Sequence, residues 1–217
     1  MKSLLLICLF LLSQLFATNI NDYINRNNCD QIIDKEYFTI CYDYKYKGAI
    51  YVSYQLKGNL VNQKNIKKRP SFYSEKTIPN KYRSKSKDYR KSGYDRGHLA
   101  SDASFDWSKK SQKKTYTMAN VIPQAPKVNR KAWIKVEKLE RLIAVKLGNV
   151  NVLNGIVYGN SPKRIGKNKI AVPKGFWKMI YNDKMGYKKC FYYENDNNIN
   201  TKEDKLRNHL IECNKLY

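Results

Sequence analysis

An amphipathic helical pattern in the second half of the chain constrains the fold most. Between residues 130 and 147, apolar side chains recur at steps of three and four and so share one helix face; they are Ala132, Val136, Leu139, Ile143 and Leu147. Asn129 stands where an N-cap would be, and Gly148 stands where a C-cap would be. A helix with one apolar face must pack against another layer, which the rest of the chain has to supply.

Strand-like segments on both sides of this helix supply that layer. Residues 37–44 and 49–56 are rich in aromatic and β-branched side chains, which predicts an antiparallel hairpin. Further strands are predicted at 115–122, 150–158, 169–172, 175–181 and 188–193, a last helix at 203–212, and an ordered loop region at 62–93. This order predicts an α+β fold, with a central antiparallel or mixed sheet flanked by helices, in a single domain over residues 18–217.

The first residues have the pattern of a targeting segment. A basic start at Met1-Lys2 is followed by the apolar run Ser3–Phe16 and by Ala17-Thr18, which predicts a secretory signal peptide over residues 1–17. An uncleaved N-terminal anchor is the alternative. The expectation is an exported protein, periplasmic or extracellular, without stable membrane insertion, because no later stretch is long and apolar enough to span a bilayer.

Four cysteines follow the predicted signal peptide: Cys29, Cys41, Cys190 and Cys213. An even number in an exported chain indicates two disulfides, and four cysteines allow three connectivities. We favour Cys29–Cys41 with Cys190–Cys213, because the members of each pair are close in sequence. A zinc site is less favoured, since the chain has no C-x-x-C motif and only two histidines.

The charge balance limits the partners of the chain. It has 42 Lys and Arg against 18 Asp and Glu, a formal net charge of +24 at pH 7. Such a balance favours polyanions, namely nucleic acid, anionic lipid or acidic polysaccharide, although a lysine-rich composition can also be a bias of the source. A membrane-active cationic protein is disfavoured, because there is no basic amphipathic helix with a bulky apolar face.

One short motif combines the groups that phosphodiester cleavage needs: Asp95-Arg96-Gly97-His98. A neutral imidazole can take a proton from water near neutral pH. A guanidinium binds phosphate through two parallel hydrogen bonds, and a glycine lets the backbone approach closely. The alternative is an ordinary turn histidine beside a solvated Asp95–Arg96 pair, so the motif needs support from elsewhere in the chain.

That support comes from segments around the motif. Downstream lie Met118–Gln124 (MANVIPQ), Val128–Trp133 (VNRKAW) and Val136–Glu140 (VEKLE), and upstream lies Lys68–Phe72 (KRPSF). In this combination, over about residues 40–195, the chain resembles the DNA/RNA non-specific endonuclease family, whose site is the ββα-metal (His-Me finger) motif. Two departures, Ala119 for a serine and Val128 for a leucine, do not touch the chemistry.

The resemblance implies a role for each matching position. His98 matches the general base, and Asn129 matches the single protein ligand of one Mg²⁺ ion per site, with Mn²⁺ as a substitute. Glu137 matches an acid that steadies a metal-bound water. Arg96 and Arg69 match arginines that hold the scissile phosphate. The implied nuclease fold is the ββα-metal type.

Helix geometry refines these roles. The rise from Asn129 to Glu137 is about 12 Å at 1.5 Å per residue, so Glu137 belongs behind the metal's water shell rather than on the ion. Asp95 and Asn120 are expected to orient the groups that act. Two structural alternatives stay open, with Asn129 as nothing more than an N-cap and Glu137 as a solvated face residue.

The sequence therefore predicts a sugar-non-specific endonuclease that hydrolyses single- or double-stranded DNA and RNA with little sequence preference and leaves 5′-phosphate products. A homodimer is compatible with the sequence. The rival is a non-catalytic nucleic-acid-binding protein with a decayed site. The joint presence of His98, Asn129 and Arg96 argues against decay.

Overall fold

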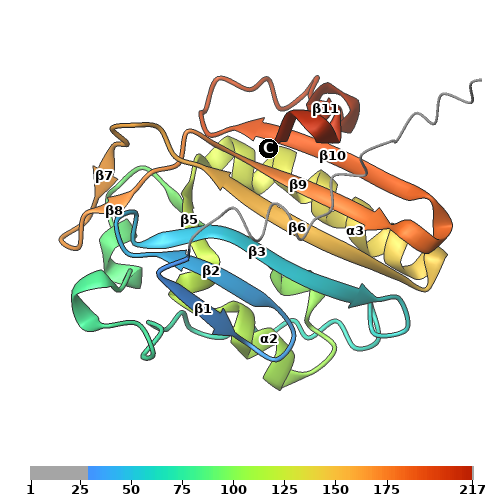
Figure 1. The fold of residues 1–217 in the computed structure, drawn as a ribbon, viewed down its shortest axis with the longest axis horizontal. Coiled ribbons are helices and arrows are strands. Elements are labelled where there is room, and N and C mark those ends of the chain that lie inside the picture. The colour runs from blue at the N-terminus through green and yellow to red at the C-terminus, as the bar shows by residue number, and fades with distance from the viewer. Residues whose placement is uncertain (1–28, 217) are drawn as a thin grey trace, which may run out of the picture.

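The computed structural model describes residues 29–216, and they are built around one seven-stranded sheet. Its order is β1-β2-β3-β6-β9-β10-β11, and every neighbouring pair is antiparallel (Figure 1). The strands are β1 (Gln31–Asp34), β2 (Thr39–Asp43), β3 (Gly48–Lys57), β6 (Asn149–Val157), β9 (Gly175–Asn182), β10 (Tyr187–Glu194) and β11 (Leu210–Ile211). The predicted hairpin and the predicted strands at 150–158, 175–181 and 188–193 are confirmed.

The helix α3 (Trp133–Leu147) packs across one face of this sheet, against β3, β6 and β9 (Figure 1). Trp133, Val136 and Ala144 are buried in the cluster between the helix and the sheet. Gly148 follows with a φ of 83°, a left-handed backbone conformation that ends the helix. The helix predicted from the apolar stripe is therefore confirmed.

The start of this helix differs from the prediction. Helical backbone begins at Pro126 and passes through a π-helical turn, Val128–Ala132, before α3. Proline suits a first helical position, since it lacks an N–H that would have no partner there. The N–H of Asn129 already bonds to the carbonyl of Ala125 at 2.9 Å, so the prediction of Asn129 as an N-cap is wrong.

A two-stranded ribbon beside the main sheet carries the motif. It pairs β4 (Asp95–His98) with β5 (Val121–Gln124), and the helix from Pro126 follows directly. This is a ββα arrangement, as predicted. Further elements are α2 (Lys109–Thr115) and the ribbon of β7 (Arg164–Ile165) with β8 (Ile170–Ala171). The strand predicted at 115–122 is wrong in its first part, because Met118–Asn120 forms a 3-10 turn.

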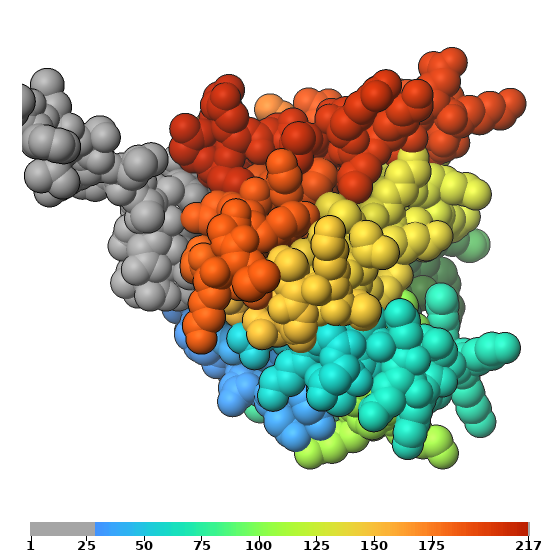
Figure 2. Space-filling view, turned by 90° about the vertical axis from the view of Figure 1, so that its right-hand side faces the viewer, coloured from blue at the N-terminus to red at the C-terminus, as the bar shows by residue number. Residues whose placement is uncertain are grey.

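The predicted helix at 203–212 is also wrong. A 3-10 turn at Leu206–His209 is followed by β11, and a second 3-10 turn runs from Cys213 to Leu216. Tertiary contacts outweigh helical propensity here, because β11 pairs with β10 and Asp204 binds both Lys135 and His209 at 2.6 Å. Figure 2 shows this C-terminal segment (red) lying on the neighbouring β9–β10 region (orange).

Both favoured disulfides are confirmed. Cys29 pairs with Cys41 and Cys190 pairs with Cys213, with Cα–Cα distances of 5.2 and 5.3 Å. Cys41 and Cys190 lie in a cluster that contains no residue of α3, so it occupies the opposite face of the sheet. Both crosslinks are therefore separated by the sheet from the helix that follows the motif. The signal peptide predicted at 1–17 lies outside the described residues.

The loop region at 62–93 is irregular but ordered, with 3-10 turns at Asn80–Tyr82 and Ser86–Tyr89. Ser84 anchors it to the neighbouring chain by donating to the carbonyl of Met118 at 2.9 Å. No helix within residues 29–216 is long and apolar enough to cross a bilayer.

Candidate active site

A cavity of about 580 Å³ collects most of the predicted site residues. Its walls come from β4, the helix after β5, the loop around Arg69, and the segment after His98. The lining residues are Arg69, Pro70, Phe72, Tyr94, Asp95, Arg96, His98, Ser101, Asp102, Ala103, Tyr116, Asn129, Arg130, Ile134, Glu137, Lys138 and Arg141. A cavity of about 640 Å³ near Tyr37 and Trp107 has no histidine in its lining, so it does not contain the predicted base.

His98 is held in this cavity by aromatic packing. Its ring centroid lies 5.2 Å from that of Phe72 and 4.9 Å from that of Tyr116. Its Nε2 atom is buried and has no hydrogen-bond partner among the described residues. Burial, aided by the positive charge of Arg69, lowers the pKa of His98 to about 4. The imidazole is therefore neutral at pH 7, as a proton acceptor must be.

Gly97 leaves room for the side chain of Gln124 on the neighbouring ribbon strand. A Cβ atom at this position would lie 1.9 Å from Oε1 of Gln124, a separation that no side chain can adopt. Gly97 pairs with Ile122 across the ribbon. Any larger residue would collide with the buried Gln124 side chain, which would have to leave its position over Gly97.

The two predicted phosphate-binding arginines are held differently. Arg96 donates to the carbonyl of Ser86 at 3.3 and 3.4 Å, and its guanidinium lies 5.6 Å from the Phe72 ring centroid. Arg69 is 78% exposed, and its Nε lies 3.6 Å from Oδ2 of Asp102. Arg96 is thus positioned by the fold, whereas Arg69 extends from a loop toward solvent at the mouth of the cavity.

Asn129 faces the cavity from the π-helical turn. Its Nδ2 donates to Oδ2 of Asp95 at 3.0 Å, so the amide nitrogen is already hydrogen-bonded to the first residue of the motif. The Oδ1 atom accepts no hydrogen bond from the described residues. Asp95 also accepts two bonds from Arg130, each 2.7 Å long. Asp95 therefore orients Asn129 so that its oxygen is the atom available to a ligand.

Glu137 lies two helical turns after Asn129, half-buried in the cavity wall. Burial raises the pKa of Glu137 to about 7, and the positive charge of Lys178 opposes the rise. The alternative of a solvated surface glutamate does not fit this environment. Arg141, which the sequence did not single out, lines the same cavity one turn further along. Its spacing of four residues from Glu137 could have indicated this, because such residues share a helix face.

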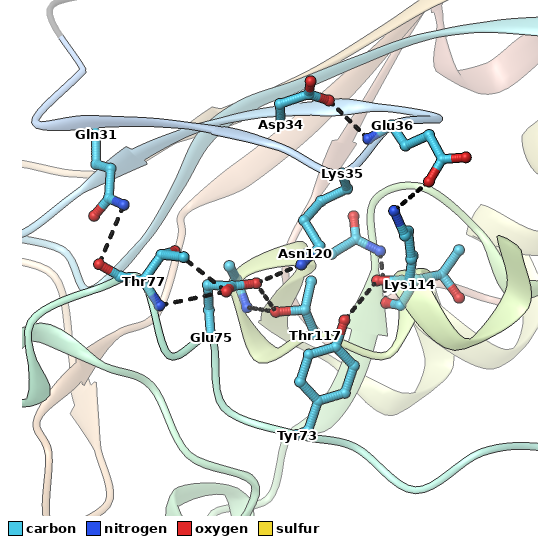
Figure 3. Close-up of polar contacts among 12 residues, drawn as sticks. Gln31, Asp34, Lys35, Glu36, Tyr73, Glu75, Thr77, Lys114, Thr117 and Asn120 are labelled. Carbon is cyan, nitrogen blue, oxygen red and sulfur yellow. Dashed lines mark hydrogen bonds and ion pairs between the residues drawn. The ribbon is translucent and has the colours of Figure 1, made fainter. Parts of the chain in front are cut away.

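Asn120 is fully buried and fixes the loop after His98. Its Nδ2 donates to the carbonyls of Ala100 and Thr115 at 2.9 Å, and its Oδ1 accepts from the N–H of Ala100 at 2.9 Å. Figure 3 shows Asn120 close to a second buried group, in which Glu75 binds Lys35 at 2.7 Å and Thr117 at 3.1 Å. Asn120 thus has the geometry of an orienting residue and does not line the cavity.

The donors in the cavity suit a hard divalent cation. Asn129 offers an amide oxygen, and Asp95 and Glu137 offer carboxylates nearby; oxygen ligands of this kind are preferred by Mg²⁺. Among residues 29–216 no group of three or more His, Cys, Asp or Glu side chains could hold a metal ion. A cation here would therefore keep most of its coordination positions for water and substrate oxygens, as catalysis on phosphate requires.

Comparison with known proteins places this geometry in a family. The sequence model that describes the DNA/RNA non-specific endonuclease family matches residues 17–216 of this chain. The chain belongs to that family. It is a family of metal-dependent nucleases, so the predicted family membership is confirmed.

Two curated relatives and one solved structure illustrate the relationship. Human mitochondrial endonuclease G is 34% identical over 160 residues, which are 69% of this chain and 54% of that protein. The mitochondrial nuclease of Saccharomyces cerevisiae is 29% identical over 167 residues, 68% of this chain and 49% of that protein. The chain thus spans about half the length of these relatives. A crystal structure of the EndoG/EndoGI complex matches with a TM-score of 0.78 at 23% identity, covering 87% of this chain and 82% of that one, which confirms the fold.

The relatives also correct the expected localisation. Those from human, cattle, two yeasts and Caenorhabditis elegans are all named as mitochondrial nucleases, which contradicts a periplasmic or extracellular protein. The error has a physical origin. A basic start followed by an apolar run indicates targeting, but this pattern alone does not specify the compartment.

Proposed function

We propose that this chain is an endonuclease that hydrolyses phosphodiester bonds in both DNA and RNA with little sequence preference. The observation that carries the proposal is the single cavity in which His98, Arg96, Asn129 and Glu137 meet. Its lining has five cationic side chains and three acidic ones, which favours a polyanion; the cations are Arg69, Arg96, Arg130, Lys138 and Arg141. Groups that bind phosphate do not distinguish bases or sugars, so indifference to both follows.

His98 is the general base in this proposal. Its neutral imidazole takes a proton from the attacking water, which then adds to phosphorus in line with the leaving 3′ oxygen. The enclosure by Phe72 and Tyr116 supports this role, because it keeps the ring both fixed and uncharged. The product then carries the 5′-phosphate.

The remaining groups bind and orient the reactants. Arg96 and Arg69 hold the scissile phosphate, and Glu137 accepts a hydrogen bond from a water in the cavity. Asn129 Oδ1 is the protein ligand for one divalent ion, with Mg²⁺ as the ion that the donor set fits best. When bound, that ion stabilises the negative charge that develops on the phosphate and on the leaving oxygen. Asp95 and Asn120 position Asn129 and the loop after His98.

The rival is a nucleic-acid-binding protein without activity, and one experiment separates the two. Purified protein is incubated with plasmid DNA and with RNA, in Mg²⁺ and in chelator. We expect both polymers to be cut internally in Mg²⁺, with no cleavage in chelator. Binding of both polymers without cleavage under either condition would favour the rival.

A further inference from the structure

We propose that Arg130 is a positioning residue that acts through Asp95 to hold the Asn129 amide with its oxygen toward the divalent ion. The inference rests on the proposed metal-binding role of Asn129. Arg130 directly follows Asn129 in the chain and lies outside the Asp95–His98 motif, so the motif did not point to it.

The contacts form a short relay. Arg130 binds Asp95 through both ends of its guanidinium, with Nε 2.7 Å from Oδ2 and Nη2 2.7 Å from Oδ1. Asp95 Oδ2 also accepts from Asn129 Nδ2 at 3.0 Å. Two parallel bonds fix the plane of a carboxylate, whereas one bond leaves it free to rotate. Arg130 therefore determines how the Asp95 carboxylate faces Asn129.

The chemistry of the two groups then decides which amide atom faces the ion. An ionised carboxylate has no hydrogen to donate, so an asparagine beside it must present its nitrogen. The amide oxygen consequently points away from Asp95 and into the cavity. A carboxylate that turned away would let the amide rotate by half a turn and present N–H groups, which cannot bind a cation.

The local backbone makes this relay geometrically accessible. Consecutive residues of a helical turn point in different directions, so Asn129 and Arg130 could not meet one partner if both had short side chains. Arg130 reaches Asp95 with its long side chain. The Arg130 side chain remains 65% exposed, whereas the Asp95 side chain is only 17% exposed. The arginine thus covers the carboxylate from the solvent side without filling the cavity.

The test measures metal affinity in the full chain without nucleic acid. Mn²⁺ is titrated into the protein, and the free ion is followed by its paramagnetic resonance signal. Arg130→Gln should weaken Mn²⁺ binding by about tenfold, because outer partners of metal ligands contribute about 10- to 100-fold to affinity. Arg130→Lys should fall between Arg130→Gln and the unmodified chain, since lysine keeps the charge but not the paired bonds.

Two further variants isolate the mechanism. Lys131→Gln removes the same charge from the neighbouring exposed position and should leave Mn²⁺ affinity unchanged. Asp95→Asn should weaken binding, and adding Arg130→Gln to it should change nothing further, because Arg130 acts only through Asp95. Circular dichroism verifies that each variant is folded.

The possible failures are distinguishable. Unchanged Mn²⁺ affinity in Arg130→Gln, or an equal loss in Lys131→Gln, would overturn the role of Arg130. If Asn129→Ala binds Mn²⁺ as well as the unmodified chain does, the metal-binding role of Asn129 itself is wrong. Weaker nucleic-acid binding by Arg130→Gln at unchanged Mn²⁺ affinity would make Arg130 a substrate contact instead.

Discussion

Lys178 on β9 and Glu140 on α3 form an ion pair in which both side chains are fully buried. Tyr54 on β3 donates to the same carboxylate at 2.9 Å, and Ser104 donates to it at 2.6 Å. The pair therefore ties the helix, the sheet and the segment after His98 together. It also lies close enough to Glu137 for the Lys178 charge to oppose the rise of the Glu137 pKa.

Lys178→Met should destabilise the protein by about 3–5 kcal/mol, because it leaves the Glu140 carboxylate buried without its counter-charge. Urea denaturation followed by circular dichroism measures this loss. The double variant Lys178→Met with Glu140→Leu should recover much of the lost stability, since it removes both charges. A double variant as unstable as the single one would show that packing, rather than charge pairing, sets the cost.

His98→Ala should lower turnover by about 10²–10⁴-fold, the range that a general base contributes. Folding and nucleic-acid binding should persist, because the arginines that line the cavity remain. His209→Gln is the matched control. His209 stacks on Tyr193 at 3.9 Å and binds Asp204, so its loss should reduce stability and leave turnover intact. Near-normal cleavage by His98→Ala would disprove its role.

The pH dependence of activity should reflect Glu137. Its pKa of about 7 means that the carboxyl is mostly protonated below that pH and carries the negative charge of a strong acceptor only above it. Turnover should therefore rise as the pH increases through about 7. His98 protonates only near pH 4, so it does not set this limb. A bound divalent ion favours the ionised carboxylate, so higher Mg²⁺ concentrations should move the limb to lower pH.

Glu137→Gln provides the control for this assignment. Glutamine keeps the size of the side chain but does not titrate, so the rise near pH 7 should disappear while a lower, flat activity remains. Initial rates from pH 5 to 9 at fixed ionic strength measure the effect. An unchanged limb in this variant would assign the titration to another group.

Binding should weaken steeply between about 50 and 200 mM salt, because each neutralised phosphate releases counterions. DNA and RNA should show similar slopes when the logarithm of affinity is plotted against that of salt. Arg141→Gln should reduce the slope by about 1 without changing sequence preference, as expected for one phosphate contact. A flat salt response would contradict the polyanion interpretation of the cavity.

The sequence predicted the parts of this site that depend on local pattern. The apolar stripe located α3, and the motif with its downstream segments located His98 and Asn129. The sequence did not predict contacts between distant segments, because nothing in the spacing of Glu140 and Lys178 indicates that they meet. The π-helical turn at Val128–Ala132 was also missed, because its pattern of apolar residues does not differ from that of an α-helix over five residues. The prediction of a last helix failed because of a contact between distant segments, since the pairing of β11 with β10 determines the structure of residues 203–212.

Reduction of the disulfides should lower the melting temperature without removing activity. The bridges join residues 12 and 23 positions apart, and loop entropy makes each worth about 3 kcal/mol. Cys41 and Cys190 lie on the sheet face away from α3, so the cavity should keep its shape. Serine variants of each pair are made separately and compared by thermal unfolding and by turnover well below the melting temperature.

The two bridges should differ in their effect on the rest of the fold. Removing Cys190–Cys213 should have the larger effect, because it frees the segment whose Asp204 holds Lys135 on α3. Loss of turnover in the still-folded Cys29–Cys41 variant would contradict the separation of that bridge from the site.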